Sequence, residues 1–206
     1  MKINLFITVI ILPVFLQLIS CGRTYTPEQK KYISGIEKFR YEKNSSMKND
    51  PDSPFNLDKN VPFHPLKYFA VDPDYAFKSR LFKYANPDTV KIFGTKGEER
   101  KAVRFGFVIF PRNNTDYKIN VYKGFTKNGK GYYEIWFTDK TTGNETYGVG
   151  RYLDFDLIDD TNYVYTIDFN LAYNPYCSYS ARYSCAIPTK EDHLDIEIAA
   201  GEKKFH

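Results

Sequence analysis

The stretch KAVRFGFVIFPRNNTDYKINVYKGF, residues 101–125, decides the fold class. Each half alternates its side chains with the period of two that is typical of a β-strand, and the polar PRNNTD at 111–116 has turn chemistry. We expect one face of each half to lie against the core: Val103, Phe105, Phe107 and Ile109 in the first, and Tyr117, Ile119 and Val121 in the second. The stretch therefore predicts two strands joined by a short turn.

Other strand-like runs lie on both sides of this stretch. In residues 131–139, Tyr133, Ile135 and Phe137 are expected to face opposite to Tyr132, Glu134 and Trp136. Aromatic residues make up 17% of the chain, and they suit pleated, half-buried surfaces. Because short turns and no long helical pattern separate the runs, we predict a mainly β domain, an antiparallel barrel or sandwich, over residues 61–206. The remaining predicted strands are LKYFAVD at 66–72, YAFKSRLFKY at 75–84, NYVYTIDFN at 162–170 and HLDIEIAA at 193–200.

One amphipathic helix is expected to precede this domain, within the segment 21–60. Thr26 is suited to cap the helix, Pro27 fits the first helical position, and Gln29 completes a capping box. Ile33, Ile36 and Phe39 give it a partly apolar face, and the polar NSSMKNDPDSP at 44–54 is expected to end it.

The first twenty-one residues, MKINLFITVIILPVFLQLISC, predict a lipoprotein signal peptide over 1–20. Lys2 forms a charged start, an apolar run follows, and LISC at 18–21 resembles the lipobox of bacterial lipoproteins. By that resemblance, cleavage precedes Cys21, which is then acylated, so that the segment 21–60 becomes a lipidated tether. An uncleaved anchor helix is the alternative. We therefore expect a protein of the bacterial cell envelope with a lipid membrane as its partner.

Cysteine usage fits an exported protein. Of three cysteines, lipidation would use Cys21, which leaves Cys177 and Cys185 as a pair. Outside the cytoplasm such a pair is usually a disulfide. A zinc site with His193 is the alternative, although three scattered ligands without a CxxC motif are poor evidence for one.

Six blocks of sequence together resemble the family called domain of unknown function 1684. The similarity covers roughly residues 35–204. It implies a single β-rich domain, often found in bacterial lipoproteins, and it implies no established activity. The chain departs from the family pattern at His64 and Tyr176. The blocks are SPF at 53–55, YFAVD at 68–72, TGNETYGVGRYLD at 142–154, DFNLAYNPYC at 168–177, CAIP at 185–188 and AGEK at 200–203.

Two of these blocks carry the candidate site. If 147–154 is a strand, Glu145 and Arg151 share a face, either as a buried ion pair or with Arg151 free to hold a carboxylate, a phosphate or a sugar oxygen. The facing wall of such a pocket would come from 168–174, with polar side chains at a strand exit. The candidate pocket residues are Glu145, Arg151, Asp168, Asn170, Tyr173 and Asn174.

No catalytic motif accompanies these residues. The sequence holds neither HExxH nor Gly-x-Ser-x-Gly nor a phosphate-loop glycine pattern, and we predict no metal and no cofactor. A formal charge of +4, evenly spread, gives no reason to expect nucleic acid. We therefore expect an envelope binding or scaffold module with a polar pocket for a small anionic or sugar-like ligand, its protein partners unknown. The alternative is a hydrolase of envelope material that acts through Glu145 and Asp168.

Overall fold

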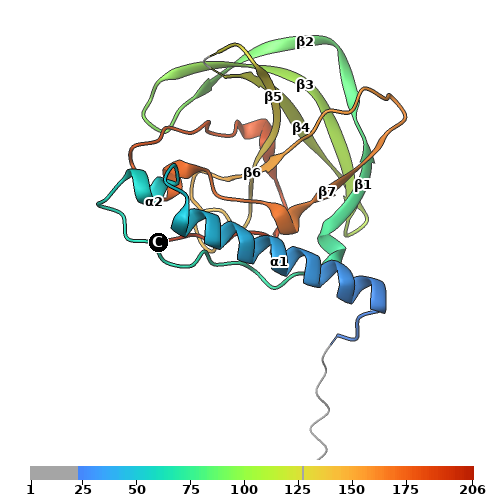
Figure 1. Cartoon of the computed structure of the whole chain (residues 1–206). Coiled ribbons are helices and arrows are strands. Elements are labelled where there is room, and N and C mark those ends of the chain that lie inside the picture. The colour runs from blue at the N-terminus through green and yellow to red at the C-terminus, as the bar shows by residue number, and fades with distance from the viewer. Residues whose placement is uncertain (1–22, 127) are drawn as a thin grey trace, which may run out of the picture.

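The computed structural model describes residues 23–126 and 128–206, so the predicted signal peptide and the lipidation site at Cys21 lie outside the described residues. The described chain is mainly antiparallel β-sheet with one long N-terminal helix, as the sequence predicts. Figure 1 shows the strands as a strongly curved sheet, with the helix α1 lying across one end of it. No described helix has the length and apolar character that crossing a membrane requires.

The main sheet has the strand order β2-β3-β4-β5-β6, each pair antiparallel, and β8 adds to β5 in parallel. Strands β1 and β7 form a separate antiparallel pair. Among the described residues no pairing joins β2 to β6, so the sheet is open rather than a closed barrel. The strands are β1 (Ala76–Arg80), β2 (Phe82–Phe93), β3 (Glu99–Arg112), β4 (Thr115–Phe125), β5 (Gly131–Asp139), β6 (Arg151–Asp154), β7 (Val164–Asp168) and β8 (His193–Leu194).

Strand β3 has its core face opposite to the predicted one. Val108 and Phe110 are fully buried in the main core beside β4, whereas Phe105 and Phe107 are half-buried. Both faces of this strand are apolar, so periodicity alone could not choose between them. A register shift between Arg104 and Gly106 also reverses the alternation, so that even-numbered residues before the shift point to the opposite face from even-numbered residues after it.

The sheet packs its apolar residues into two clusters. The predicted faces of β5 are confirmed, because Ile135 and Phe137 enter the main core while Trp136 enters a second cluster on the other side of the sheet. In that second cluster the Trp136 ring stacks on Tyr122 with centroids 4.6 Å apart and contacts Tyr152 at 6.0 Å. The two faces of β5 thus serve different parts of the molecule.

Two predicted strands are mostly irregular. Residues 66–72 make only an isolated bridge, between Tyr68 and Glu202. In 193–200 only β8 pairs with a neighbour, although Ile196 and Ile198 alternate into the core as a strand would. The carbonyls of Ile198 and Ala200 accept hydrogen bonds from the Arg151 side chain rather than from a neighbouring strand, while the carbonyl of Ile196 accepts from Lys140 N at 3.0 Å. The segment therefore alternates without a continuous ladder.

Helix α1 (Pro27–Asn49) starts where predicted and ends later than predicted. Gln29 N donates to Thr26 Oγ1 at 3.2 Å and Thr26 N donates to Gln29 Oε1 at 3.0 Å, which is the expected capping box. The helix continues to Asn49, just before Asp50-Pro51, because a proline disfavours helical backbone in the residue that precedes it. A short helix, α2 (Pro54–Leu57), follows.

Polar contacts dock α1 on the domain. Arg40 donates to the carbonyls of Phe69, at 2.8 Å, and Asn170, at 3.1 Å. Lys43 pairs with Glu202 at 2.7 Å, and Glu202 is only 1% exposed. Of the predicted apolar face, Ile36 is buried but Phe39 is 45% exposed. The helix is therefore a docked part of the structure, and one of its edges stays open to solvent.

Candidate functional site

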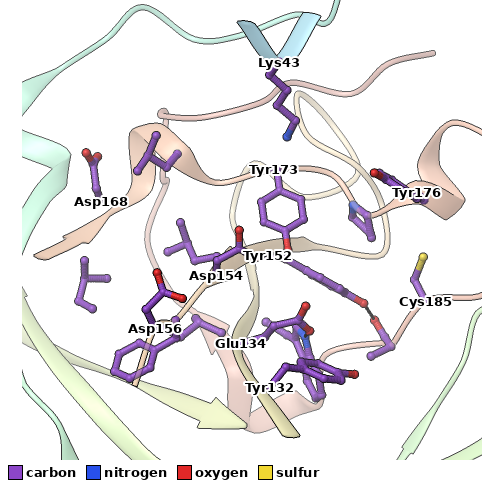
Figure 2. A pocket seen from close by; sticks show the side chains of 18 of the residues that line it. Lys43, Tyr132, Glu134, Tyr152, Asp154, Asp156, Asp168, Tyr173, Tyr176 and Cys185 are labelled. Carbon is purple, nitrogen blue, oxygen red and sulfur yellow. Dashed lines mark hydrogen bonds between the residues drawn. The ribbon is translucent and has the colours of Figure 1, made fainter. Parts of the chain in front are cut away.

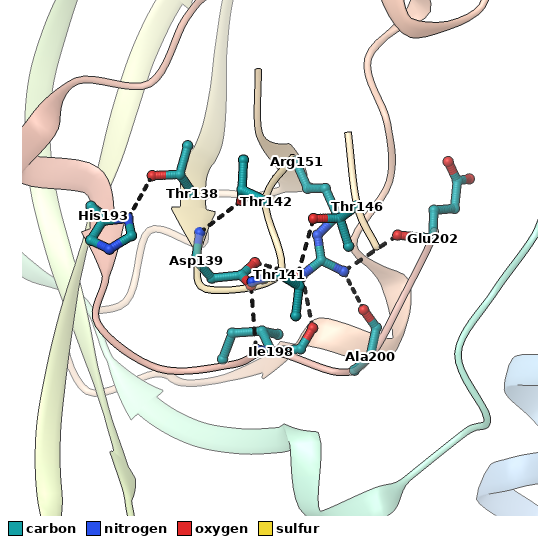
Figure 3. Close-up of polar contacts among 10 residues, drawn as sticks. All are labelled: Thr138, Asp139, Thr141, Thr142, Thr146, Arg151, His193, Ile198, Ala200 and Glu202. Atoms are coloured by element: carbon teal, nitrogen blue, oxygen red, sulfur yellow. Dashed lines mark hydrogen bonds and ion pairs between the residues drawn. The ribbon is translucent and has the colours of Figure 1, made fainter. Parts of the chain in front are cut away.

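Arg151, the centre of the predicted pocket, lies inside the protein. Its side chain is 0% exposed and pairs with Asp139, also 0% exposed, with 2.7 Å between Nη2 and Oδ2. It also donates to the carbonyls of Ile198 at 2.8 Å, Ala200, and Glu202 at 3.4 Å (Figure 3). The predicted pairing of Arg151 with Glu145 is wrong, because the arginine holds together β5, β6 and the C-terminal segment.

The turn between β5 and β6 explains why this part of the sequence is so polar. Asp139 Oδ1 accepts from both the amide and the hydroxyl of Thr141, each at 2.6 Å, and Thr141 meets Thr146 at 3.0 Å. Glu145 is exposed at the tip of this turn and pairs with Lys203 at 3.2 Å. The polar chemistry of 139–151 therefore serves mainly to order the turn.

The other predicted pocket residues divide between a buried network and an open cleft. Asn170 and Asn174 are buried and bonded to backbone, Asn170 to Asp72 O at 2.8 Å and Asn174 to Lys203 O at 2.8 Å. Asp168 accepts from Tyr32 of α1 at 2.7 Å and also lines the cleft, as does Tyr173. Asp168 and Tyr173 thus both line the cleft, and Asn170 lies behind it, bonded to Asp168 Oδ1 at 3.1 Å. Glu145, Arg151 and Asn174 do not line the cleft.

The cleft lies between α1, the β5–β6 pair and the segment after β7, and its volume is about 1000 Å³. Figure 2 shows Lys43 reaching down from α1 over Tyr173, with Tyr132 and Glu134 on the opposite side. The wall is rich in aromatic side chains and carboxylates. Its charged residues and its Tyr and Trp residues are Lys43, Arg100, Tyr132, Glu134, Trp136, Tyr152, Asp154, Asp156, Tyr163, Tyr165, Asp168, Tyr173 and Tyr176.

Glu134 and Asp154 form the centre of the cleft. They are direct partners across the β5–β6 pair, so their side chains leave the same face of the sheet, with Cβ atoms about 5 Å apart. Glu134 Oε2 accepts from Trp136 Nε1 at 2.7 Å, and Asp154 Oδ1 accepts from the Tyr173 hydroxyl at 2.7 Å. Burial, with a contribution from the charge of Asp154, raises the pKa of Glu134, and the Trp136 bond opposes the rise.

The two cations that line the cleft already have carboxylate partners. Lys43 binds Glu202, and its Nζ lies 4.7 Å from the centre of the Tyr173 ring. Arg100 pairs with Glu98, whose pKa falls to about 2, chiefly through a hydrogen bond from the Ser184 hydroxyl, so this glutamate is ionised at neutral pH. Neither Glu202 nor Glu98 lines the cleft.

A disulfide joins Cys177 and Cys185, as predicted, with Cα atoms 6.0 Å apart. Cys185 lies on the cleft wall beside Ala186, whose carbonyl accepts from the Tyr152 hydroxyl. Among residues 23–126 and 128–206, no group of three or more His, Cys, Asp or Glu side chains is arranged to hold a metal ion. The bridge therefore fixes the loop 177–185 against the cleft.

Sequence analysis did not single out the central residues Glu134, Trp136 and Asp154. A signal was present in GYYEIWFTD at 131–139, where the face opposite the core carries Tyr132, Glu134 and Trp136. An outward strand face that combines aromatic rings with a carboxylate is unusual for a solvated surface and typical of a binding wall. Asp154 could be placed beside Glu134 only once the β5–β6 register was known.

Comparison with known proteins identifies the family. The model of DUF1684, described as a protein of unknown function, matches residues 61–203. The chain belongs to this family. A similar solved structure is the solution NMR structure of an uncharacterized protein from gene locus rrnAC0354 of Haloarcula marismortui, with 25% identity and a TM-score of 0.61 over 85% of this chain and 96% of that one. No curated protein matches.

Proposed function

We propose that this DUF1684 protein is a membrane-tethered binding module of the bacterial cell envelope whose cleft takes a sugar-like ligand. The observation that carries the proposal is the cleft lining, in which aromatic rings alternate with carboxylates. Sugars present apolar ring faces that pack on aromatic side chains and hydroxyls that donate to carboxylates. The cleft volume of about 1000 Å³ is at the upper end of the range usual for small-molecule sites, about 300–1,000 Å³.

Electrostatics favour a sugar-like ligand over an anionic one. The lining contains Glu134, Asp154, Asp156 and Asp168, whereas Lys43 and Arg100 are neutralised by carboxylates behind the wall. An anionic ligand would meet like charges, which costs binding free energy. Arg151, the expected anion-binding residue, is occupied by Asp139 and three carbonyls.

The tether follows from the sequence and is compatible with the docked helix. Five residues lie between Cys21 and the first residue of α1, Pro27, so the two are at most about 21 Å apart along an extended chain. Acylation of Cys21 would thus hold the domain and its cleft close to a membrane surface. Labelling cells with an acyl-chain probe tests this, since Cys21→Ser should abolish both labelling and membrane association. Equal labelling of the two proteins would contradict the tether.

Binding is testable because Trp136, the single tryptophan of the chain, lines the cleft. We expect envelope oligosaccharides to change its fluorescence in the wild type. Tyr173→Phe, which removes the hydroxyl bonded to Asp154, should weaken this response, whereas Tyr41→Phe on the exposed side of α1 should leave it unchanged. A response identical in both variants would place the ligand elsewhere.

A hydrolase is the second candidate, and the structure favours a different carboxylate pair from the predicted one. Glu145 lies on the surface turn and does not line the cleft, whereas Glu134 and Asp154 lie side by side in it. Burial raises the pKa of Glu134 and suits it to act as a general acid, while Asp154 is held by Tyr173. Product formation from a bound oligosaccharide, lost in Glu134→Gln while binding persists, would establish this activity.

A further inference from the structure

The cleft carries carboxylates that no protein cation neutralises. Among the described residues, Glu134, Asp154 and Asp156 make no ion pair. In the described part of the chain, the side chains that donate to Glu134 and Asp154 are neutral, the Trp136 indole for Glu134 and the Tyr173 hydroxyl for Asp154. Of the three, Glu134 is half-buried, and a carboxylate that is partly removed from water is usually paired with a cation; Asp154 and Asp156 are exposed and add their charge to the cleft. At this wall the protein itself provides none.

The cations nearest to these carboxylates are held by other groups. Lys43 is bound by Glu202, which also accepts from the Tyr179 hydroxyl at 2.6 Å, so this glutamate is fixed in place. Arg100 donates to Glu98 and to the carbonyl of Ser184 at 2.7 Å. Because each cation satisfies a carboxylate outside the cleft, the cleft retains a net negative charge.

Aromatic rings surround the same carboxylates. The Trp136 indole donates to Glu134, and the Tyr173 hydroxyl donates to Asp154. The rings of Tyr132, Tyr163 and Tyr176, which are 38–44% exposed, also line the cleft. The face of an aromatic ring attracts an organic cation, by about 0.5–2 kcal/mol per contact. Carboxylates and aromatic faces together form the lining that recognises a protonated amine, and they offer no comparable advantage to a neutral amide.

From this combination we infer that the ligand of the cleft is an amine-bearing saccharide, one whose amino groups are free and protonated rather than N-acetylated. The inference rests on the proposed sugar-binding function and specifies that the sugar carries a positive charge. The sugar rings pack on the aromatic wall, and an ammonium group lies between Glu134 and Asp154. The bound ammonium supplies the positive charge that the wall lacks.

The experiment compares two trisaccharides with the same skeleton, the trimer of glucosamine and the trimer of N-acetylglucosamine, by titrating Trp136 fluorescence at pH 6. We expect the glucosamine trimer to bind at least tenfold more tightly. Its affinity should fall as salt rises, because a cation–carboxylate contact is screened. Asp154→Asn should remove most of the preference. The matched control is Asp195→Asn, which removes the same charge from an exposed position and should leave the preference intact.

The outcomes distinguish the preference for an amine from the binding of a sugar. Equal affinity for both trimers, with no salt dependence, would overturn the inference and leave the sugar-binding proposal standing. No binding of either trimer would overturn both. Choline serves as a cation without a sugar ring, and affinity for choline equal to that for the glucosamine trimer would refute the saccharide part. The salt dependence of the wild type keeps the test decisive even if Asp154→Asn folds poorly.

Discussion

Replacing Arg151 with methionine should destabilise the protein strongly, because the side chain is the buried centre of a polar network. Its guanidinium pairs with Asp139, and both side chains are 0% exposed. In Arg151→Met the Asp139 carboxylate would stay buried with only neutral donors, and the carbonyls of Ile198 and Ala200 would lose their donor. Breaking a buried pair on one side costs about 3–5 kcal/mol. At about 2–4 °C per kcal/mol for a chain of this size, the melting temperature should fall by about 6–20 °C.

Thermal unfolding followed by circular dichroism measures this effect, with Lys140→Met as the matched control. Lys140 follows Asp139 in the chain and pairs with Asp195 at 3.0 Å, but its side chain is 51% exposed. An exposed pair of this kind contributes about 0–1 kcal/mol. The double variant Asp139→Asn/Arg151→Met should lose less stability than the sum of its single variants. If Arg151→Met costs no more than Lys140→Met, the buried network does not stabilise the fold as argued.

Three further predictions follow from single contacts. Burial raises the pKa of Glu134 in the folded state. The stability that this protonated carboxyl contributes is therefore present below the pKa of the unfolded state and is lost as the pH rises through the pKa of the folded state. Glu134→Gln should melt at a higher temperature than wild type at pH 7 and at the same temperature at about pH 4. Gly201→Ala should lower the free energy of unfolding by about 2–3 kcal/mol in chemical denaturation, and Gly143→Ala by about 1 kcal/mol. Both glycines have positive φ, but of the two only Gly201 would bring a Cβ within 2.6 Å of a carbonyl oxygen, so equal losses would contradict this reasoning. Reducing Cys177–Cys185 should lower stability by about 2.5 kcal/mol, and two thiols alkylated without reductant would argue against the bridge.

The local features of the fold could be predicted because they depend on neighbouring residues. The capping box of Thr26 and Gln29 needs only a spacing of three, and the core face of β5 follows from Ile135 and Phe137. The core face of β3 was assigned wrongly because its two faces are about equally apolar. The face of β3 that enters the core depends on which residues of β4 lie opposite it and on the register shift near Gly106. Both depend on how β3 pairs with β4, which the residues of β3 alone do not show.

The partner of Arg151 could not be predicted for a related reason. Glu145 is nearer in the chain and has the same parity, but the turn between β5 and β6 interrupts the alternation and carries Glu145 to the surface. Asp139 lies twelve residues before Arg151, and the carbonyls that complete its network lie 47 to 51 residues after it. Parity constrains side chains only within an unbroken strand, so this contact required the three-dimensional structure.

The blocks that carry the family resemblance contribute unequally to the cleft, and this bears on what family membership implies. They supply the buried residues Arg151 and Glu202, which hold the scaffold, and one wall of the cleft through Asp154 and Tyr173. The neighbouring strand β5, outside those blocks, supplies Glu134 and Trp136 to the same face of the sheet. Trp136 is 2% exposed in the second cluster and contributes to folding, whereas Glu134 is half-buried, so replacing Glu134 should cost the fold less than replacing Trp136. Under the proposed amine specificity, Glu134 is therefore the cleft residue whose replacement should change ligand preference at the least cost to the fold.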